Sequence, residues 1–202
     1  MMEEKELKIS LSEKEYNLLV KTKSNDTKEV RQVNHYFDTK NLTFKKNNIT
    51  LRMRSETNSI QLTLKIKSKV QNQIVHSEEY NYDLTKKQYR QILECPILIF
   101  NILGSQASQC IFSLGIKAGD IMYLDKIKNL RISYEIKGNI VFQIDKTYFP
   151  NNKVEYELEV ENLSSAEGVL MLLKKDFGII AKNHNPASKY SRFIKYLNTD
   201  TV

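Results

Sequence analysis

The chain contains few of the residues that mark several protein classes. Its 202 residues include no tryptophan, three prolines, six glycines and two cysteines. Cys95 and Cys110 alone cannot make a disulfide scaffold, and His35, His76 and His184 are scattered without the spacing of a zinc site. We expect both cysteines to be buried apolar residues of a protein in the reducing cytoplasm.

Long apolar segments and glycine-rich loops are also absent. The sequence has no run of eighteen apolar residues that would cross a membrane, and its charged N-terminal segment has no apolar core of a secretion signal. No glycine-rich phosphate-binding loop occurs, so this is not a P-loop protein. We therefore expect a cytoplasmic protein without a membrane partner.

The charge balance is basic. The chain carries 31 Lys and Arg against 24 Asp and Glu, a net charge of +7 that suggests an anionic partner, although a lysine-rich composition alone can produce it. We do not expect DNA as a partner, and the lack of interleaved aromatic and basic residues argues against RNA. No linker or repeat divides the sequence, so residues 1–202 are interpreted as one domain, in a monomer or a homodimer.

The first strand-like stretch carries charges on one face. Read with a period of two, Glu4, Glu6 and Lys8 point one way, while Leu7 and Ile9 point the other. Carboxylates two residues apart on a strand lie ~7 Å from each other and repel, and a cation between them would reverse that sign. Taken alone, this stretch is better explained as an ordinary solvated strand face, so a functional meaning depends on the other strands.

Other stretches repeat the pattern of like charges at every second position. The stretch from Ile74 to Tyr82 alternates poorly, so either Glu78 or Glu79 points to the charged side, and we favour Glu79. The like-charged sets are Arg52 with Arg54, Lys65 with Lys67, and Glu155, Glu157, Glu159 and Glu161 together, while Arg131 and Asp145 add one charge each.

These faces predict an α+β fold in which about eight strands close into a barrel. Like charges side by side are unfavourable unless opposite charges or ligands face them, and eight strands suffice to close a barrel with a usable interior. Acidic strands would then neutralise basic ones across the lumen, while helices cover the apolar outer faces. The alternative is a one-sided sheet with a wet charged face. Strands are expected within about 3–82 and 120–162, and the first clear strand after the helical block begins at Leu130. Helices are expected at about 12–23, 85–114, 164–177 and 187–197. Capping boxes at Ser12, Thr85 and Ser164 open the first three of these helices.

Such a lumen suits a polyphosphate bound with a metal ion. Hard cations such as Mg²⁺ prefer carboxylate oxygens together with the phosphate oxygens of a substrate. Arginine grips phosphate through two parallel hydrogen bonds, and lysine acts as a point charge.

A set of motifs spans nearly the whole chain in a fixed order. The motifs are Glu4-x-Glu6-x-Lys8, Tyr36-Phe37-Asp38-Thr39, Leu51-Arg52-Met53-Arg54, Leu64-Lys65-Ile66-Lys67, Arg131, Asp145, Glu157-x-Glu159 and Ser188-Lys189-Tyr190-x-Arg192. They resemble those of the CYTH proteins, the triphosphate tunnel metalloenzymes, and in particular the small single-domain bacterial members of low-GC Gram-positive type. The resemblance implies an eight-stranded antiparallel barrel that forms a tunnel and acts on triphosphates with Mg²⁺ or Mn²⁺, as one or two ions.

The same resemblance implies roles for individual residues. Lys8 would be a general base only if its pKa were depressed, with Tyr36 as its partner as in some thiamine triphosphatases; otherwise Lys8 is a phosphate ligand and Tyr36 a packing aromatic. Arg192 is either a phosphate ligand or a surface residue, and Glu155 and Glu161 would lie near the tunnel mouths. The implied metal ligands are Glu4, Glu6, Asp145, Glu157 and Glu159, and the implied phosphate ligands are Lys8, Arg52, Arg54, Lys65, Lys67, Arg131, Lys189 and Arg192.

The predicted function is metal-dependent hydrolysis of a terminal phosphoanhydride, in inorganic tripolyphosphate or a small organic triphosphate such as thiamine triphosphate. One alternative is a class IV-type adenylate cyclase, which would need an adenine pocket that no sequence feature defines. The other is a non-catalytic module that binds polyphosphate or nucleotide. We favour the enzyme because acidic pairs have little purpose in an anion sensor that holds no metal.

Overall fold

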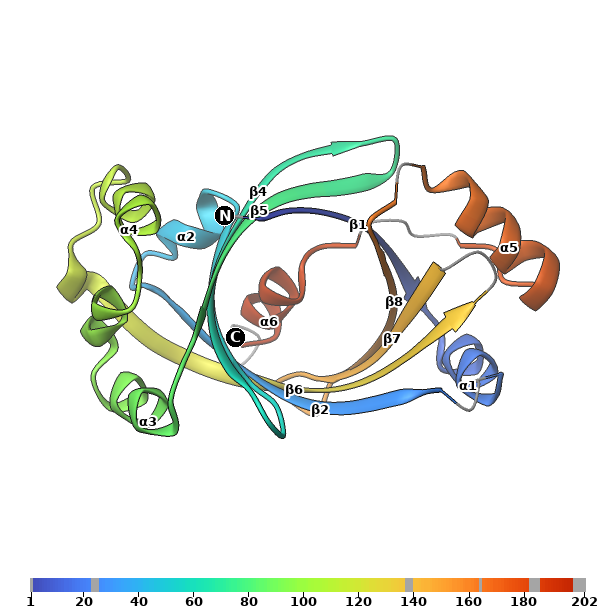
Figure 1. Cartoon of the computed structure of the whole chain (residues 1–202), viewed down its shortest axis with the longest axis horizontal. Helices are drawn as coiled ribbons and strands as arrows, with labels where there is room; N and C mark the ends of the chain where they lie inside the picture. Colours follow the sequence, from blue (N-terminus) through green and yellow to red (C-terminus); the bar gives the residue numbers. More distant parts are fainter. Residues whose placement is uncertain (1, 23–25, 137–139, 164, 182–185, 198–202) are drawn as a thin grey trace.

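A computed structural model describes residues 2–22, 26–136, 140–163, 165–181 and 186–197. Eight antiparallel strands form a closed barrel in the order β1-β5-β4-β3-β2-β6-β7-β8 (Figure 1), which confirms the predicted fold. Their bounds are β1 Met2–Leu11, β2 Lys28–Thr39, β3 Ile49–Ser55, β4 Ile60–Gln71, β5 Ile74–Asp83, β6 Ile121–Ile136, β7 Ile140–Tyr148 and β8 Val154–Glu161.

Strand β6 begins at Ile121, well before the expected start at Leu130. Its pairing with β2 shifts register, so that Tyr36 faces Asp125 and Phe37 faces Tyr123, which leaves Leu124 without a partner. Such a bulge breaks the alternation of side chains, and a period of two read from sequence therefore misses this half of the strand.

The helices are α1 Glu13–Lys21, α2 Thr43–Lys46, α3 Lys86–Glu94, α4 Ser105–Phe112, α5 Glu167–Phe177 and α6 Lys189–Leu197, with short 3-10 helices η1 Pro96–Asn101 and η2 Ala118–Asp120. Capping boxes open α1 at Ser12 and α3 at Thr85, as predicted. The third expected box involves Ser164, which lies outside the described residues, and the helix there begins at Glu167. None of the described helices is long and apolar enough to cross a membrane.

Two apolar clusters cover the outside of the barrel. On one side, α1 and α5 pack on β1, β7 and β8, where Leu7, Leu19 and Leu158 are fully buried. On the other side, α2, α3 and α4 pack on β3 and β4, where Phe44 and Leu62 are fully buried. Each such side chain contributes roughly 1.5–3 kcal/mol by its removal from water, so the outward faces stabilise the barrel and leave the inward faces free for polar residues.

Helix α6 differs from the expectation that it covers the outside, because it lies across the lumen (Figure 1). Tyr190, Phe193 and Ile194 pack on Tyr36 and Ile127 in a third apolar cluster. The apolar side of α6 thus faces a barrel wall that is itself partly apolar, while Lys189 and Arg192 reach the carboxylates described below.

The two cysteines form no disulfide. The expectation that both are buried is wrong for Cys95, which is exposed, while Cys110 is partly buried. Cys95 sits at the junction of α3 and η1, where the chain turns at the surface of the helical block.

Candidate functional site

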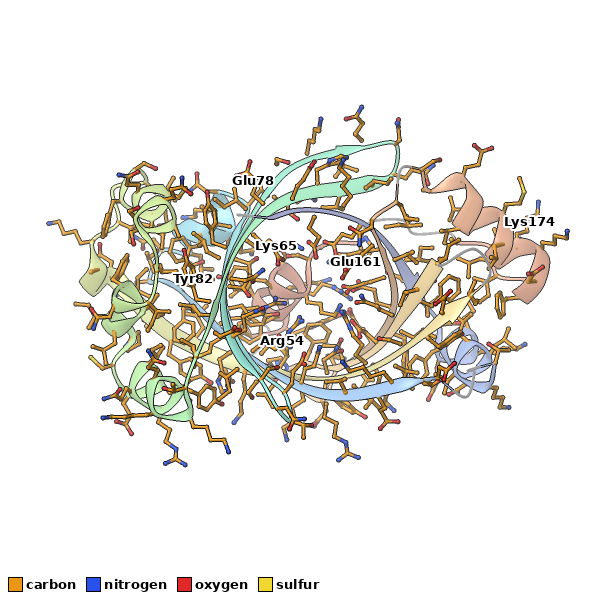
Figure 2. The ribbon with its side chains drawn as sticks, in the orientation of Figure 1. Arg54, Lys65, Glu78, Tyr82, Glu161 and Lys174 are labelled. Carbon is orange, nitrogen blue, oxygen red and sulfur yellow. The ribbon has the colours of Figure 1, made fainter. Side chains whose placement is uncertain are left out.

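A cavity of about 430 Å³ occupies the lumen. Figure 2 shows Arg54, Lys65 and Glu161 inside the ring of strands, whereas Glu78 lies outside it. Glu78 is exposed and Glu79 is 7 % exposed, which agrees with the choice of Glu79 as the inward-facing acid. The predicted site residues that line the cavity are Glu4, Glu6, Lys8, Tyr36, Arg52, Arg54, Lys65, Lys67, Glu79, Arg131, Glu159 and Lys189.

One group of carboxylates surrounds the ammonium of Lys65. Its Nζ lies 3.0 Å from Glu6 Oε1 and 3.3 Å from Glu79 Oε1, and it also contacts Glu4. The register of β1, β5 and β4 brings these four side chains together. Burial and repulsion by Glu6 raise the pKa of Glu4. Burial alone would also raise the pKa values of Glu6 and Glu79. Nearby cations, Lys65 among them, outweigh this effect, so the pKa values of both residues are lowered.

A second group surrounds the ammonium of Lys189. Its Nζ lies 2.8 Å from Asp145 Oδ2, and 2.6 Å from Oε1 of both Glu157 and Glu159. One oxygen of each carboxylate lies within 4.8 Å of the others, all three being buried. Burial raises the pKa of Glu157, whereas for Asp145 and Glu159 the surrounding cations outweigh burial and lower it.

Lys8 connects the two groups. Its Nζ lies 3.0 Å from Glu6 Oε1 and 3.3 Å from Glu159 Oε1. Burial lowers the pKa of Lys8, but Glu159 and Glu6 outweigh it and raise the pKa well above its usual value. Lys8 is therefore an ammonium near neutral pH, and this environment favours a phosphate ligand over a general base.

Arg131 and Arg192 are already paired with carboxylates. Arg131 holds Asp145 through two hydrogen bonds, Nε–Oδ1 of 2.8 Å and Nη2–Oδ2 of 2.6 Å, and also contacts Glu159. Arg192 does not line the cavity: it is 11 % exposed, and its guanidinium lies 2.5 Å from both Glu155 and Glu157. It is thus a largely buried counter-charge for the carboxylates of β8 rather than a surface residue.

Arg52 and Arg54 differ from these cations. Within the described residues, neither forms an ion pair with a carboxylate, and Arg52 Nε is buried without a hydrogen-bond partner. Arg54 Nε donates to Asn34 Oδ1 over 2.9 Å. Burial, then Arg52 and Arg131, lower the pKa of Arg54 to about 10. In the described part of the chain these two guanidiniums are therefore not paired with a carboxylate, and they can bind an anion.

Tyr36 lines the cavity but is 2 % exposed. Its ring packs 5.1 Å from that of Tyr190 and 5.0 Å from that of Phe193. Burial raises the pKa of its hydroxyl, so the group stays protonated near neutral pH. These contacts describe a packing aromatic, and a catalytic role stays a prediction.

Sequence reasoning missed several lining residues. Gln61 lies four residues before Lys65 on β4, and Asn81 lies two residues after Glu79 on β5, and both line the cavity. The same period of two would therefore have assigned them to the inner face of the barrel. Lys45 lines the cavity from α2, a four-residue helix for which no charge pattern exists. Asp145 and Glu157 do not line the cavity, and they lie behind Lys189 and Glu159.

The donors present fit a hard divalent cation. Each group offers three carboxylates, the ligands that Mg²⁺ and Mn²⁺ take together with phosphate oxygens. In both groups a lysine ammonium now provides the compensating positive charge, so the acids are arranged to surround a cation.

The CYTH domain family model matches residues 2–183, which is most of the chain. The chain belongs to the CYTH family. The matched residues include the motifs from β1 through β8, and the closed barrel agrees with this result. A search of curated proteins finds no match.

Solved structures share the fold of this CYTH protein. An adenylyl cyclase candidate from Hippeastrum, with a dominant triphosphatase activity, superposes with a TM-score of 0.80 at 22% identity, over 96% of each chain. A provisionally assigned adenylate cyclase from Bacillus halodurans gives 0.72 at 20% identity, over 93% of this chain and 95% of that one. The protein PH1819 from Pyrococcus horikoshii gives 0.63 at 15% identity, over 95% and 98%. At these identities the likeness shows the fold alone.

Proposed function

We propose that this CYTH protein is a divalent-metal-dependent triphosphatase, which hydrolyses a terminal phosphoanhydride bond of inorganic tripolyphosphate or a small organic triphosphate. The observation that carries the proposal is the division of charge in one cavity. Among the described residues, Arg52 and Arg54 form no ion pair with a carboxylate, while one group of three carboxylates surrounds Lys65 and another surrounds Lys189 in the same barrel. A polyanion bound together with a cation satisfies both sides.

The side chains bind and orient the substrate. Arg52 and Arg54 hold phosphate oxygens through their planar forks, and Lys65, Lys67 and Lys8 add point charges around the same cavity. Glu4, Glu6, Glu79, Glu157, Glu159 and Asp145 are the residues that would hold Mg²⁺ or Mn²⁺, as one or two ions. When bound, the ion supplies charge neutralisation of the phosphates and a lowered pKa for a water molecule.

The reaction needs little covalent chemistry from the protein. A water oxygen attacks the terminal phosphorus, and the bond from that phosphorus to its bridging oxygen breaks. The diphosphate leaves with the bridging oxygen, the terminal phosphoryl group becomes orthophosphate, and the protons of the water pass to these products or to solvent. Most of the acceleration then comes from positioning and from cations preorganised around the developing charge. Lys8, held as an ammonium between Glu6 and Glu159, is assigned to phosphate binding.

The lining of the cavity favours inorganic tripolyphosphate as the first substrate to test. Its only aromatic members among the described residues are Tyr36 and Tyr190, whose rings pack against each other and are 2 % exposed. No aromatic face is thus available to stack on adenine, which argues against an adenylate cyclase. The triphosphatase activity named for the Hippeastrum structure supports hydrolysis, and the acidic groups argue against a sensor that binds anions alone.

A substrate panel separates the alternatives. Purified protein is incubated with tripolyphosphate, thiamine triphosphate or ATP, each with Mg²⁺, Mn²⁺ or a chelator. Orthophosphate released only with metal supports the proposal. Cyclic AMP with pyrophosphate identifies a cyclase, and tight binding of tripolyphosphate without turnover under any metal identifies a binding module.

Substitutions that each remove one carboxylate charge test the metal site. We expect Glu159→Gln and Glu6→Gln to lower metal-dependent turnover about 100-fold or more, because each removes a carboxylate ligand. Binding of tripolyphosphate without metal should persist, because the lumen becomes more positive. Glu135→Gln is the matched control, since Glu135 is an exposed strand residue outside the cavity. Near wild-type turnover in both lumen variants, measured with folded protein by circular dichroism, would show the metal site to be wrong.

A further inference from the structure

Asp38 at the end of β2 is a buried carboxylate that the proposed reaction does not use. It is 0 % exposed, and its negative charge is met by four hydrogen bonds. Oδ1 accepts from the backbone N–H of Thr39 at 2.7 Å and of Phe44 at 2.9 Å. Oδ2 accepts from the backbone N–H of Lys45 at 3.1 Å and from the hydroxyl of Tyr190 at 2.5 Å. Buried carboxylates persist only with such donors, and bonds to a charged acceptor are the strong ones.

These four bonds join β2 to α2, which follows it closely in the sequence, and to α6, which is 152 positions away at Tyr190. Phe44 and Lys45 belong to α2, so Asp38 fixes the helix that brings Lys45 to the cavity wall. Tyr190 belongs to the first turn of α6, directly after Lys189. The side chain of Tyr190 is buried, and its ring packs against that of Tyr36. Its only polar group, the hydroxyl, donates to Asp38, so this hydrogen bond fixes where α6 begins.

The position of that helix start decides where the Lys189 ammonium lies. Lys189 Nζ is within 2.8 Å of oxygens from three carboxylates on β7 and β8. Ion-pair and hydrogen-bond energies fall steeply over an ångström at such distances. A small shift of the first turn of α6 would therefore remove Lys189 from this group, without any change in the barrel.

We propose that Asp38 is a positioning residue of the lumen site. Through the Tyr190 hydroxyl it holds the start of α6, so that Lys189 stays among Asp145, Glu157 and Glu159. Through the backbone of α2 it holds Lys45 at the cavity wall. Asp38 itself touches neither the cavity nor the reacting phosphates. The inference concerns the same site as the proposed triphosphatase and rests on that function only for its effect on activity.

The test removes one hydroxyl. Tyr190→Phe deletes the donor to Asp38 and keeps the ring, and Tyr134→Phe is the matched control. Tyr134 is equally buried, and its hydroxyl donates to the backbone oxygen of Leu19 at 2.8 Å, on the outer side of the barrel. We expect Tyr190→Phe to lower kcat/KM for tripolyphosphate about 10-fold while Tyr134→Phe leaves it unchanged, with similar changes of Tm in the two variants.

A second readout reports on Lys189 directly and needs no activity. Its side chain is 11 % exposed and paired with three carboxylates, so an amine-reactive reagent should label it slowly. We expect the labelling rate of Lys189, measured by mass spectrometry, to rise at least about 5-fold in Tyr190→Phe and to stay constant in Tyr134→Phe. Lys65, 20 % exposed in the other group, is the internal standard.

The outcomes separate this inference from the proposed function. Unchanged labelling of Lys189 in Tyr190→Phe overturns the role of Asp38, whatever happens to activity. Faster labelling with unchanged kcat/KM overturns its importance for the reaction. If the wild-type protein hydrolyses no triphosphate, the proposed function is wrong, and the labelling rates still decide whether Asp38 positions Lys189.

Discussion

Arg54→Gln should make the ligand-free protein more stable, although Arg54 is expected to bind substrate. The guanidinium of Arg54 is partly buried beside Arg52 and Arg131, and burial together with these two cations lowers its pKa from its ordinary value to about 10. Below pH 10 the folded protein therefore carries a charge that costs more in the folded state than in the unfolded state. Glutamine removes the charge and keeps an amide that can hydrogen-bond to Asn34.

The size of the effect follows from that shift. Each pKa unit corresponds to about 1.4 kcal/mol, so a lowering of this size corresponds to about 3 kcal/mol. Arg54 is not fully enclosed and donates one hydrogen bond that glutamine reproduces imperfectly, so we reduce the expected gain to about 1–2 kcal/mol. For a domain of this length that raises Tm by about 2–8 °C.

The assay is thermal unfolding at pH 7 in buffer without phosphate or metal, with Arg131→Gln as the opposite control. Arg131 is paired with Asp145 and Glu159, so its loss leaves buried carboxylates without a partner and should cost about 3–5 kcal/mol. Added tripolyphosphate should stabilise the wild type more than Arg54→Gln, because binding to the folded state raises Tm. If Arg54→Gln unfolds at a lower temperature than the wild type without ligand, the conclusion that no negative charge among the described residues fully compensates the Arg54 guanidinium is refuted.

Two further predictions concern residues on either side of the barrel wall. Glu79→Gln should lower metal-dependent turnover about 10-fold or more, whereas Glu78→Gln on the outer face of the same strand should not change it. Equal effects of the two substitutions would refute the conclusion that Glu79 faces the lumen and Glu78 faces outward. His35, held between Tyr89 and Tyr123, has its pKa lowered to about 4 by burial and then by Lys126, so it stays neutral in the folded state. Between about pH 6.5 and 4 the unfolded state then binds a proton that the folded state does not. Stability should therefore fall with decreasing pH, by up to about 3 kcal/mol, and His35→Gln should remove this dependence in denaturant titrations.

Side-chain facing was the part of the fold that the sequence predicted best. Arg52 with Arg54 on β3, and Glu157 with Glu159 on β8, point to one side of their strands, because alternation in a regular strand depends on local geometry alone. Glu79 was the harder case. The outer face of β5 carries Glu78, and the inner face carries Ser77, so charge does not distinguish the two faces there.

Pairing between charges could not be predicted, because it depends on which strands are neighbours. Lys65 was expected to be a phosphate ligand, and the structure places its ammonium among Glu4, Glu6 and Glu79, since β5 lies between β1 and β4. Lys189 likewise lies among carboxylates because α6 crosses the lumen. The motif that contains Asp38 was visible in the sequence, but its hydrogen bond to Tyr190 joins residues 152 positions apart.

The closure of the barrel also sets when the site can form during folding. Strand β1 pairs with β5 on one side and with β8 on the other, so that Lys8 faces Glu159 only after the chain has been made through Glu161. Contacts between residues so far apart in sequence are slow to form and come after local helices and hairpins. A polyphosphate or metal ion that needs both β1 and β8 can therefore bind only the closed barrel. We expect such ligands to slow unfolding while leaving the rate of folding nearly unchanged.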